Sequence, residues 1–126
     1  MNTLKLNNAI GETLARFTQT VSSTLGPCGR SVMIRTDGRV ARITKDGVTV
    51  ANAIKSEDPV EQALIEVIRQ ASRATVETAG DGTTSTAVIA HSLYDKLSRV
   101  LRENDNAVQI QERLEKFNQV ILNWIK

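Results

Sequence analysis

The sequence predicts a mainly α-helical fold that carries one small β-hairpin. Four segments repeat apolar residues every three or four positions, which is the spacing of a helix with one buried face. An Asp37-Gly38 pair lies between two short β-prone runs, which is typical of a tight hairpin turn. A chain of 126 residues is long enough to build one core, so we expect a single domain over residues 1–126.

The first half is expected to form a helix, the hairpin and a turn. Gly26-Pro27 should end the helix, because glycine and proline are typical of helix ends. The hairpin is expected over residues 31–43. A second turn, Thr44-Lys45-Asp46-Gly47, then leads into a short apolar run over residues 48–51. The apolar stripe of the first helix comprises Ile10, Leu14, Phe17, Val21 and Leu25.

Three further helices are expected in the second half. Asp58-Pro59 opens the first of them, because proline suits the first helical position, and that helix runs to Gly80. The next begins near Gly82 and reaches Leu101, and Asn104-Asp105-Asn106 forms a turn with capping residues. The last helix has an apolar stripe for which a place in the core is the ordinary interpretation. This stripe comprises Val108, Ile110, Leu114, Phe117, Ile121 and Trp124.

Composition argues against several classes of function. The formal net charge is only +2, basic and acidic residues are interleaved, and aromatic residues make up 3% of the chain, so we expect no nucleic-acid partner. The single cysteine, Cys28, excludes a disulfide within the chain. The sequence has neither the start of a signal peptide nor an apolar run of membrane-spanning length. We therefore expect a cytoplasmic protein without a membrane partner.

The stretch Ala79-Gly80-Asp81-Gly82-Thr83-Thr84-Ser85-Thr86 carries the strongest chemical signal. Its glycines allow a sharp turn, and the hydroxyl residues then fall in the first turn of a helix, where backbone amides lack partners. A carboxylate beside an anion site repels the anion unless a cation lies between them. Asp81 therefore indicates a metal–phosphate pair such as Mg-nucleotide. The ordinary alternative is a simple helix cap, which the same residues could form.

Other motifs in the chain give weaker signals. Gly80-x-Gly82-x-x-Ser85 is close to a dinucleotide fingerprint, but it follows a helical pattern rather than a strand, so we reject that interpretation. His91 is the only histidine, which excludes a multi-histidine metal site and favours a surface or packing role. Cys28 lies in a turn, and a bystander thiol is the default interpretation.

Three turns share the chemistry of an anion site, and together they resemble one family. Their strings are Thr24-Leu25-Gly26-Pro27-x-Gly29-Arg30, Ile43-Thr44-Lys45-Asp46-Gly47-Val48-Thr49-Val50-Ala51, and Ala79-Gly80-Asp81-Gly82-Thr83-Thr84. In order and approximate separation these strings are similar to those of the group I chaperonins, the GroEL-like ring-forming ATPases. The resemblance runs from about Leu14 to the end and weakens after Leu101. It implies a helical bundle like the N-terminal half of the equatorial ATP-binding domain.

The resemblance implies a site for ATP or ADP with magnesium and potassium. Asp81 matches the magnesium ligand, and Asp46 matches an acid near the terminal phosphate. The backbone carbonyls of Thr24 and Lys45 match positions that help to hold potassium. The positions that match nucleotide-binding residues are Thr24, Leu25, Gly26, Pro27, Lys45, Asp46, Gly82, Thr83, Thr84 and Ser85.

The chain also departs from the family pattern. Cys28 stands where the family usually has lysine, and Ser85 stands where it usually has threonine. A chaperonin subunit is several times longer, so we expect no counterpart of the client-binding apical domain, of the rear equatorial segment, or of the intermediate domain that positions the attacking water. We therefore expect nucleotide binding without independent ATP hydrolysis, and Asp46 is the one catalytic candidate.

The resemblance also implies partners. The hairpin over residues 31–43 matches the stem loop that pairs with a neighbouring subunit in the ring. We expect self-association, or association with a chaperonin-type subunit, through this hairpin and through exposed helix faces. Phe117 and Trp124 belong to one such face, because the family packs that helix against further segments. The alternative function is an interaction or structural assembly protein, for example in a viral particle, that keeps the fold without ATPase activity.

Overall fold

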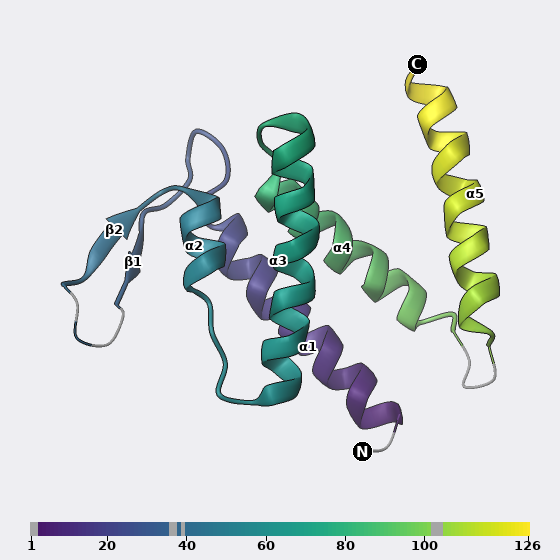
Figure 1. Ribbon diagram of the computed structural model, residues 1–126, viewed down its shortest axis with the longest axis horizontal. Helices are drawn as coiled ribbons and strands as arrows, with labels where there is room; N and C mark the ends of the chain where they lie inside the picture. The colour runs from purple at the N-terminus through teal and green to yellow at the C-terminus, as the bar shows by residue number, and fades with distance from the viewer. Residues whose placement is uncertain (1–2, 36–37, 39, 102–104) are drawn as a thin grey trace.

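The computed structural model describes residues 3–35, 38, 40–101 and 105–126. These residues form five helices and one two-stranded antiparallel sheet, so the mainly helical fold with one hairpin is confirmed. Figure 1 shows α1, α3 and α4 crossing one another, with the hairpin projecting on one side and α5 standing on the other. The elements are α1 (Thr3–Ser22), β1 (Val32–Ile34), β2 (Arg42–Thr44), α2 (Gly47–Ala53), α3 (Pro59–Ala79), α4 (Thr83–Ser98) and α5 (Ala107–Ile125).

The core forms around α1, which packs against α2, α3 and α4. Phe17 and Val21 of α1 are fully buried and meet Ile65 of α3 and Ala87 of α4 in one cluster. Burying a side chain of this size contributes roughly 1.5–3 kcal/mol, so this cluster stabilises the fold substantially. The buried apolar residues of the cluster are Leu14, Phe17, Val21, Val50, Ala51, Ile65, Ile68 and Ala87.

The ends of α3 confirm the sequence prediction. The Asp58 carboxylate accepts hydrogen bonds from the backbone amides of Val60 and Glu61, at 2.8 and 2.9 Å, and Pro59 occupies the first turn. Gly80 ends the helix with φ +80°, a left-handed conformation that glycine adopts without strain. The chain can therefore turn sharply at Gly80 and start α4 three residues later.

The predicted order of one helix, a hairpin and three helices was wrong, because it omitted α2. This helix has seven residues, too few for an apolar repeat to become visible in the sequence. Its start is capped by Asp46. At its other end, the guanidinium of Arg69 donates from Nε to the Ala51 carbonyl at 3.0 Å and from Nη2 to the Ile54 carbonyl. A buried side chain of α3 therefore holds the C-terminal end of α2.

The hairpin spans residues 32–44, one residue later than the predicted 31–43, and each of its strands has three residues. Its register pairs Val32 with Thr44, Met33 with Ile43, and Ile34 with Arg42. Of the predicted turn, Asp37 lies outside the described residues, and Gly38 has a left-handed φ of +74°. Met33 and Ile43 are both largely exposed. The hairpin thus presents an apolar cross-strand pair to solvent.

The last two helices differ from prediction in two respects. α4 ends at Ser98 rather than at Leu101. More important, α5 buries none of its residues, so the expected place of its apolar stripe in the core was wrong. Of the predicted turn before α5, Asn104 lies outside the described residues, while the Asn106 side chain caps the helix by accepting from the Val108 amide at 2.9 Å. The apolar side of α5 stays largely exposed because the core closes around α1 without it.

A buried hydroxyl in α1 provides a test of the packing. Thr13 is 2% exposed, and its Oγ1 has no hydrogen-bond partner among the described residues. Thr13→Val removes this unsatisfied group, so we expect the free energy of unfolding to rise by about 1 kcal/mol in urea titrations. Thr18→Val is the matched control, because Thr18 Oγ1 donates to the Ala87 carbonyl at 3.1 Å. Losing this hydrogen bond should lower the free energy of unfolding by about 1 kcal/mol. Equal destabilisation by both variants would contradict this packing.

Candidate functional site

Gly47, the first residue of α2, lies where the three predicted turns meet. A Cβ atom built on Gly47 would lie 2.8 Å from Oγ1 of Thr84, in the third turn. The same atom would lie 3.6 Å from Oγ1 of Thr24, in the first turn. Segments that are distant in the sequence therefore come together around one glycine, and only a residue without a side chain lets them approach so closely.

The first turn is closed by two glycines. Gly26 has φ +77°, and its carbonyl accepts from the Gly29 amide at 3.0 Å. A Cβ atom on Gly29 would lie 2.2 Å from the Thr24 carbonyl oxygen, so no other residue fits there without a shift of the backbone. Leu25 and Pro27 are exposed at the outside of this turn. The turn is thus closely packed at its base and exposed at its rim.

In the second turn, the Asp46 carboxylate caps α2. It accepts from the Val48 amide at 3.2 Å, from the Thr49 amide at 3.0 Å and from the Thr49 hydroxyl. The ionised carboxylate is stabilised first by the Thr49 hydroxyl, then by the two amides and by the nearby charge of Arg42. Partial burial acts in the opposite direction, but the pKa of Asp46 is still lowered below its usual value. Asp46 is therefore a fixed anion, while Lys45 beside it is exposed.

The third turn differs from the other helix starts in its cap. Side chains cap α2, α3 and α5, whereas the N-cap residue of α4 is Gly82, with φ +113° and no side-chain cap hydrogen bond among the described residues. Asp81 lies just outside the helix, and its Oδ1 accepts from the Gly82 amide at 2.6 Å. The first amides of α4 have no acceptor within the helix, so this start can bind an anion.

The hydroxyl residues that follow Gly82 divide into two sets. Thr83 and Thr84 are buried, and the Thr84 hydroxyl is the group that approaches Gly47. Ser85 is exposed. Buried hydroxyls fix the geometry of the α4 start, and the exposed one remains available to a ligand. The structure thus brings residues of all three turns together, while Leu25, Pro27 and Lys45 lie at the exposed margin.

The residues present fit a magnesium ion held jointly with phosphate. No group of three or more His, Cys, Asp or Glu side chains able to hold a metal occurs in the described part of the chain. Magnesium does not need such a cage, because it commonly binds one or two carboxylates, substrate phosphates and water. The exposed carboxylate of Asp81, next to an uncapped helix start, suits that mode of binding.

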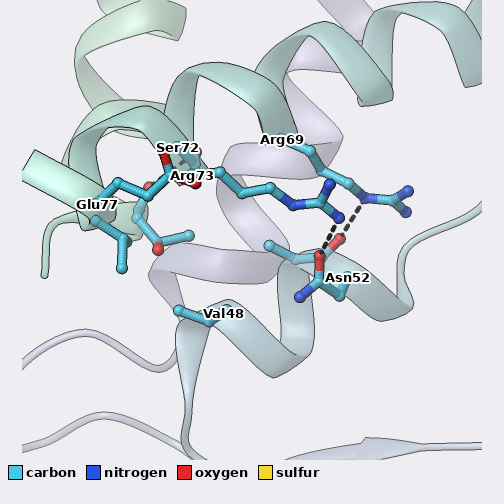
Figure 2. Close-up of a pocket in the computed structure, with 9 residues that line it drawn as sticks. Val48, Asn52, Arg69, Ser72, Arg73 and Glu77 are labelled. Atoms are coloured by element: carbon cyan, nitrogen blue, oxygen red, sulfur yellow. Dashed lines mark hydrogen bonds between the residues drawn. The ribbon is translucent and has the colours of Figure 1, made fainter. Parts of the chain in front are cut away.

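A small pocket beside this site was not found from the sequence. It has a volume of about 170 Å³ and lies between α2 and α3. Figure 2 shows Arg69 and Arg73 of α3 reaching toward α2, where Arg73 Nη2 donates to Asn52 Oδ1 at 3.2 Å. The spacing of four between the two arginines was the available signal, because it places both on one helix face. The pocket is lined by Val48, Ala51, Asn52, Arg69, Ser72, Arg73, Val76, Glu77 and Thr83.

Comparison with known proteins gives consistent matches. The model of the TCP-1/cpn60 chaperonin family matches residues 17–126. The chain is 37% identical over 107 residues to the mitochondrial chaperonin CPN60 of Euglena gracilis, an alignment that covers 85% of this chain and 19% of that protein. It is 39% identical over 106 residues to the chloroplastic chaperonin 60 subunit beta 2 of Arabidopsis thaliana, covering 84% of this chain and 18% of that protein.

A solved structure agrees with these relatives. Chaperonin gp146 from the bacteriophage EL 2 (Pseudomonas aeruginosa), crystallised in the presence of ATP-BeFx, superposes with a TM-score of 0.72 at 33% identity. The match covers 88% of this chain and 19% of gp146. The chain therefore spans about a fifth of the length of the chaperonins it matches.

The cytoplasmic location expected from the sequence stays a prediction. By their names, the two matched relatives belong to mitochondria and chloroplasts. Within the described ranges, no helix combines the length and the apolar character needed to cross a lipid bilayer.

The contact at Gly47 can be tested by a double-mutant cycle. Gly47→Ala pushes a methyl group against Thr84 Oγ1, so we expect a loss of about 1–3 kcal/mol in the free energy of unfolding, measured in urea. Thr84→Ala removes that oxygen, and the cost of Gly47→Ala should then fall by at least half. Gly11→Ala is the control, because a Cβ there meets only Tyr94 at 3.5 Å and should stabilise α1 by up to about 1 kcal/mol. Strictly additive effects at Gly47 and Thr84 would show that the two turns do not touch.

Proposed function

The chain belongs to the TCP-1/cpn60 chaperonin family, and on that premise we propose that its three converging turns bind Mg-ATP or Mg-ADP. The observation that carries the proposal is the approach of Gly47 to the hydroxyls of Thr24 and Thr84. A polyphosphate needs donors from several directions, and three turns around one point supply them. The presence of ATP-BeFx with crystalline gp146 supports a nucleotide as the ligand of this fold.

The start of α4 binds the phosphates. Its donors are the backbone amides of Thr83, Thr84 and Ser85, which lack acceptors inside the helix, together with the exposed Ser85 hydroxyl. Gly82 has a left-handed φ of +113°, and a Cβ atom there would lie 3.0 Å from Cγ2 of Thr75, so the turn into α4 requires a glycine. Asp81 contributes a carboxylate to magnesium, and magnesium, when bound, neutralises phosphate charge.

The other two turns complete the site. Leu25, Gly26 and Pro27 face the sugar and phosphate from the rim of the first turn. Lys45 adds a positive charge at the second turn, and the carbonyls of Thr24 and Lys45 hold potassium. The support for these assignments is that Leu25, Pro27 and Lys45 are exposed next to the point where the turns meet.

Binding rather than hydrolysis is the function of these 126 residues. Asp46 is the one catalytic candidate, but its carboxylate already accepts from two α2 amides and from the Thr49 hydroxyl. Its lowered pKa also makes it a weak base at neutral pH. We assign Asp46 to the shape of the site, because it fixes the start of α2. Residues 1–126 act as one domain that resembles part of a chaperonin equatorial domain.

The hairpin supports a second function, which is assembly. Met33 and Ile43 form a cross-strand pair that is exposed, and a two-stranded sheet leaves both of its edges unpaired. Such a surface can pair with a second copy or with another chaperonin-type subunit. If the protein did not bind nucleotide in solution, assembly through the hairpin would be the function that we propose.

Titration calorimetry tests the nucleotide site. We expect saturable heat with Mg-ATP, and we expect Asp81→Ala to weaken binding about ten- to a hundredfold, because it removes a charged ligand worth roughly 1.5–3 kcal/mol. Glu57→Ala is the matched control, because it removes the same charge near the start of α3. That position lies about 30 Å from Asp81 along a helix of 21 residues, so binding should stay unchanged. Absence of heat at millimolar Mg-ATP would refute nucleotide binding.

Light scattering after size-exclusion chromatography tests assembly through the hairpin. We expect a mass above the 13.8 kDa of one chain, reduced by Ile43→Glu because a buried carboxylate would disrupt an apolar contact. Val67→Glu is the matched control, since Val67 is as exposed as Ile43 but lies on α3. An unchanged mass in the Ile43 variant would exclude the hairpin as the contact.

A further inference from the structure

Arg69 of α3 is a charged side chain that is almost entirely buried. The residue is only 8% exposed, and each of its three guanidinium nitrogens has a partner. Nε donates to the Ala51 carbonyl at 3.0 Å, Nη2 donates to the Ile54 carbonyl, and Nη1 donates to Glu66 Oε2 at 3.0 Å. Figure 2 shows the side chain reaching from α3 to α2. The guanidinium therefore joins the middle of α3 to the end of α2 by directed hydrogen bonds.

The end of α2 needs a donor from outside the helix. The last four carbonyls of a helix have no partner within it, and in α2 these include the carbonyl of Ala51, a residue that is 3% exposed. The chain then leaves the helix through Ile54, whose backbone is extended. A planar guanidinium can bind two such carbonyls at once, because its N–H groups form a rigid fork, and its charge suits the negative end of the helix dipole. Arg69 thus caps the C-terminal end of α2.

The opposite end of α2 belongs to the candidate site. Asp46 caps that end, and Gly47 is the first residue of the helix and approaches the hydroxyls of Thr24 and Thr84. At 1.5 Å per residue, the seven residues of α2 span about 10 Å. Arg69 binds the far end of this helix, so it can affect a ligand at Gly47 only by fixing α2.

A helix as short as α2 depends on its surroundings for its shape. Isolated helices shorter than about 12–15 residues are marginal in water, because few hydrogen bonds compensate for the cost of forming the first turn. α2 has seven residues and is stabilised by its two caps and by Val50 and Ala51, which are buried in the core. Loss of the cap at one end therefore loosens the whole helix, including the turn at its start.

We propose that Arg69 is a positioning residue, which from the far end of α2 holds Gly47 and the second turn in the arrangement that the nucleotide site requires. This inference rests on the proposed function, because it concerns the affinity of that site for Mg-ADP. Burying a guanidinium offsets much of what its hydrogen bonds contribute to stability, so the main effect of Arg69 is on geometry. Without the guanidinium, only those molecules in which α2 is in place bind the ligand, and the measured affinity falls with their fraction.

Hydrogen exchange of the ligand-free protein tests the effect on α2. Arg69→Met keeps an unbranched apolar side chain but removes every donor. We expect the amides of Thr49 and Val50 to exchange about ten- to a hundredfold faster, because a buried carbonyl without a donor favours opening of the helix. Tyr94→Phe removes a side-chain bond to the Asn7 carbonyl, at the far end of α4, and should leave both amides at their wild-type rates.

Calorimetry with Mg-ADP tests the effect on the site. We expect Arg69→Met to weaken binding about tenfold, because few of its molecules have α2 in place before the ligand binds. Saturating Mg-ADP should then restore slow exchange at Thr49 and Val50, a recovery that a purely structural role would not produce. Arg69→Lys should bind with intermediate affinity, since an ammonium group keeps the charge but lacks the rigid fork.

Arg73→Met is the matched control for charge. It removes the same positive charge one turn further along α3, but Arg73 Nη2 donates to the side chain of Asn52 rather than to a backbone carbonyl. The Arg73 side chain is also 56% exposed, and exposed charges contribute little, so we expect binding within about twofold of wild type. If Arg73→Met weakened binding as much as Arg69→Met, positive charge would explain the effect and the proposal would be wrong.

The two measurements separate this proposal from the function on which it rests. If the wild-type chain bound no Mg-ADP while Arg69→Met still accelerated exchange in α2, the nucleotide function would fail, and the role of Arg69 in fixing the second turn would be supported. Unchanged exchange in Arg69→Met would overturn the proposal, as would unchanged affinity when the wild type binds Mg-ADP. Loss of the helical circular dichroism signal in both Arg69 variants would also overturn it, because Arg69 would then support the whole fold rather than α2.

Discussion

The approach of Gly47 to Thr84 and Thr24 is the constraint on which the rest of the site depends. α2 is short, and both of its ends are fixed. Asp46 caps its start, and Arg69 of α3 binds the carbonyls of Ala51 and Ile54 at its end. A helix held in this way sets the second turn against the other two with little freedom. The geometry of the site is therefore a consequence of α2 being secured to the core.

The parts of the chain that stabilise the fold differ from the parts that are exposed for interaction. α1, α2, α3 and α4 bury one another's apolar faces and form the core. The hairpin packs Val32 and Ile34 against that core but exposes Met33 and Ile43, and α5 buries no residue. Exposed apolar side chains that gather in one place often mark an interaction surface. The start of α4 likewise has no side-chain cap hydrogen bond among the described residues, whereas side chains cap α2, α3 and α5. Both features support the ligand and the partner that we propose.

The sequence predicted the parts of the fold that depend only on residues close together along the chain. Asp58-Pro59 and Gly80 bound α3 as expected, because caps and glycine conformations depend on a few neighbouring residues. α2 was missed because seven residues show no period, and its stability comes from Arg69, which is distant in the sequence. The sequence left two places open for Phe117 and Trp124, the core and an exposed face, since an amphipathic stripe looks the same in both cases; the structure exposes them. The residues of the site were named from motifs, but their meeting at Gly47 required the tertiary structure.

Paramagnetic broadening by manganese tests the central claim most directly. With Mn²⁺ in place of magnesium and ADP present, amide signals near the bound ion broaden in a two-dimensional NMR spectrum of the whole chain. The account predicts that signals of Gly26, Gly47 and Thr83 broaden together, because all three turns surround one metal–nucleotide pair. Broadening at only one turn, or scattered among acidic residues such as Glu57 and Glu112, would contradict it.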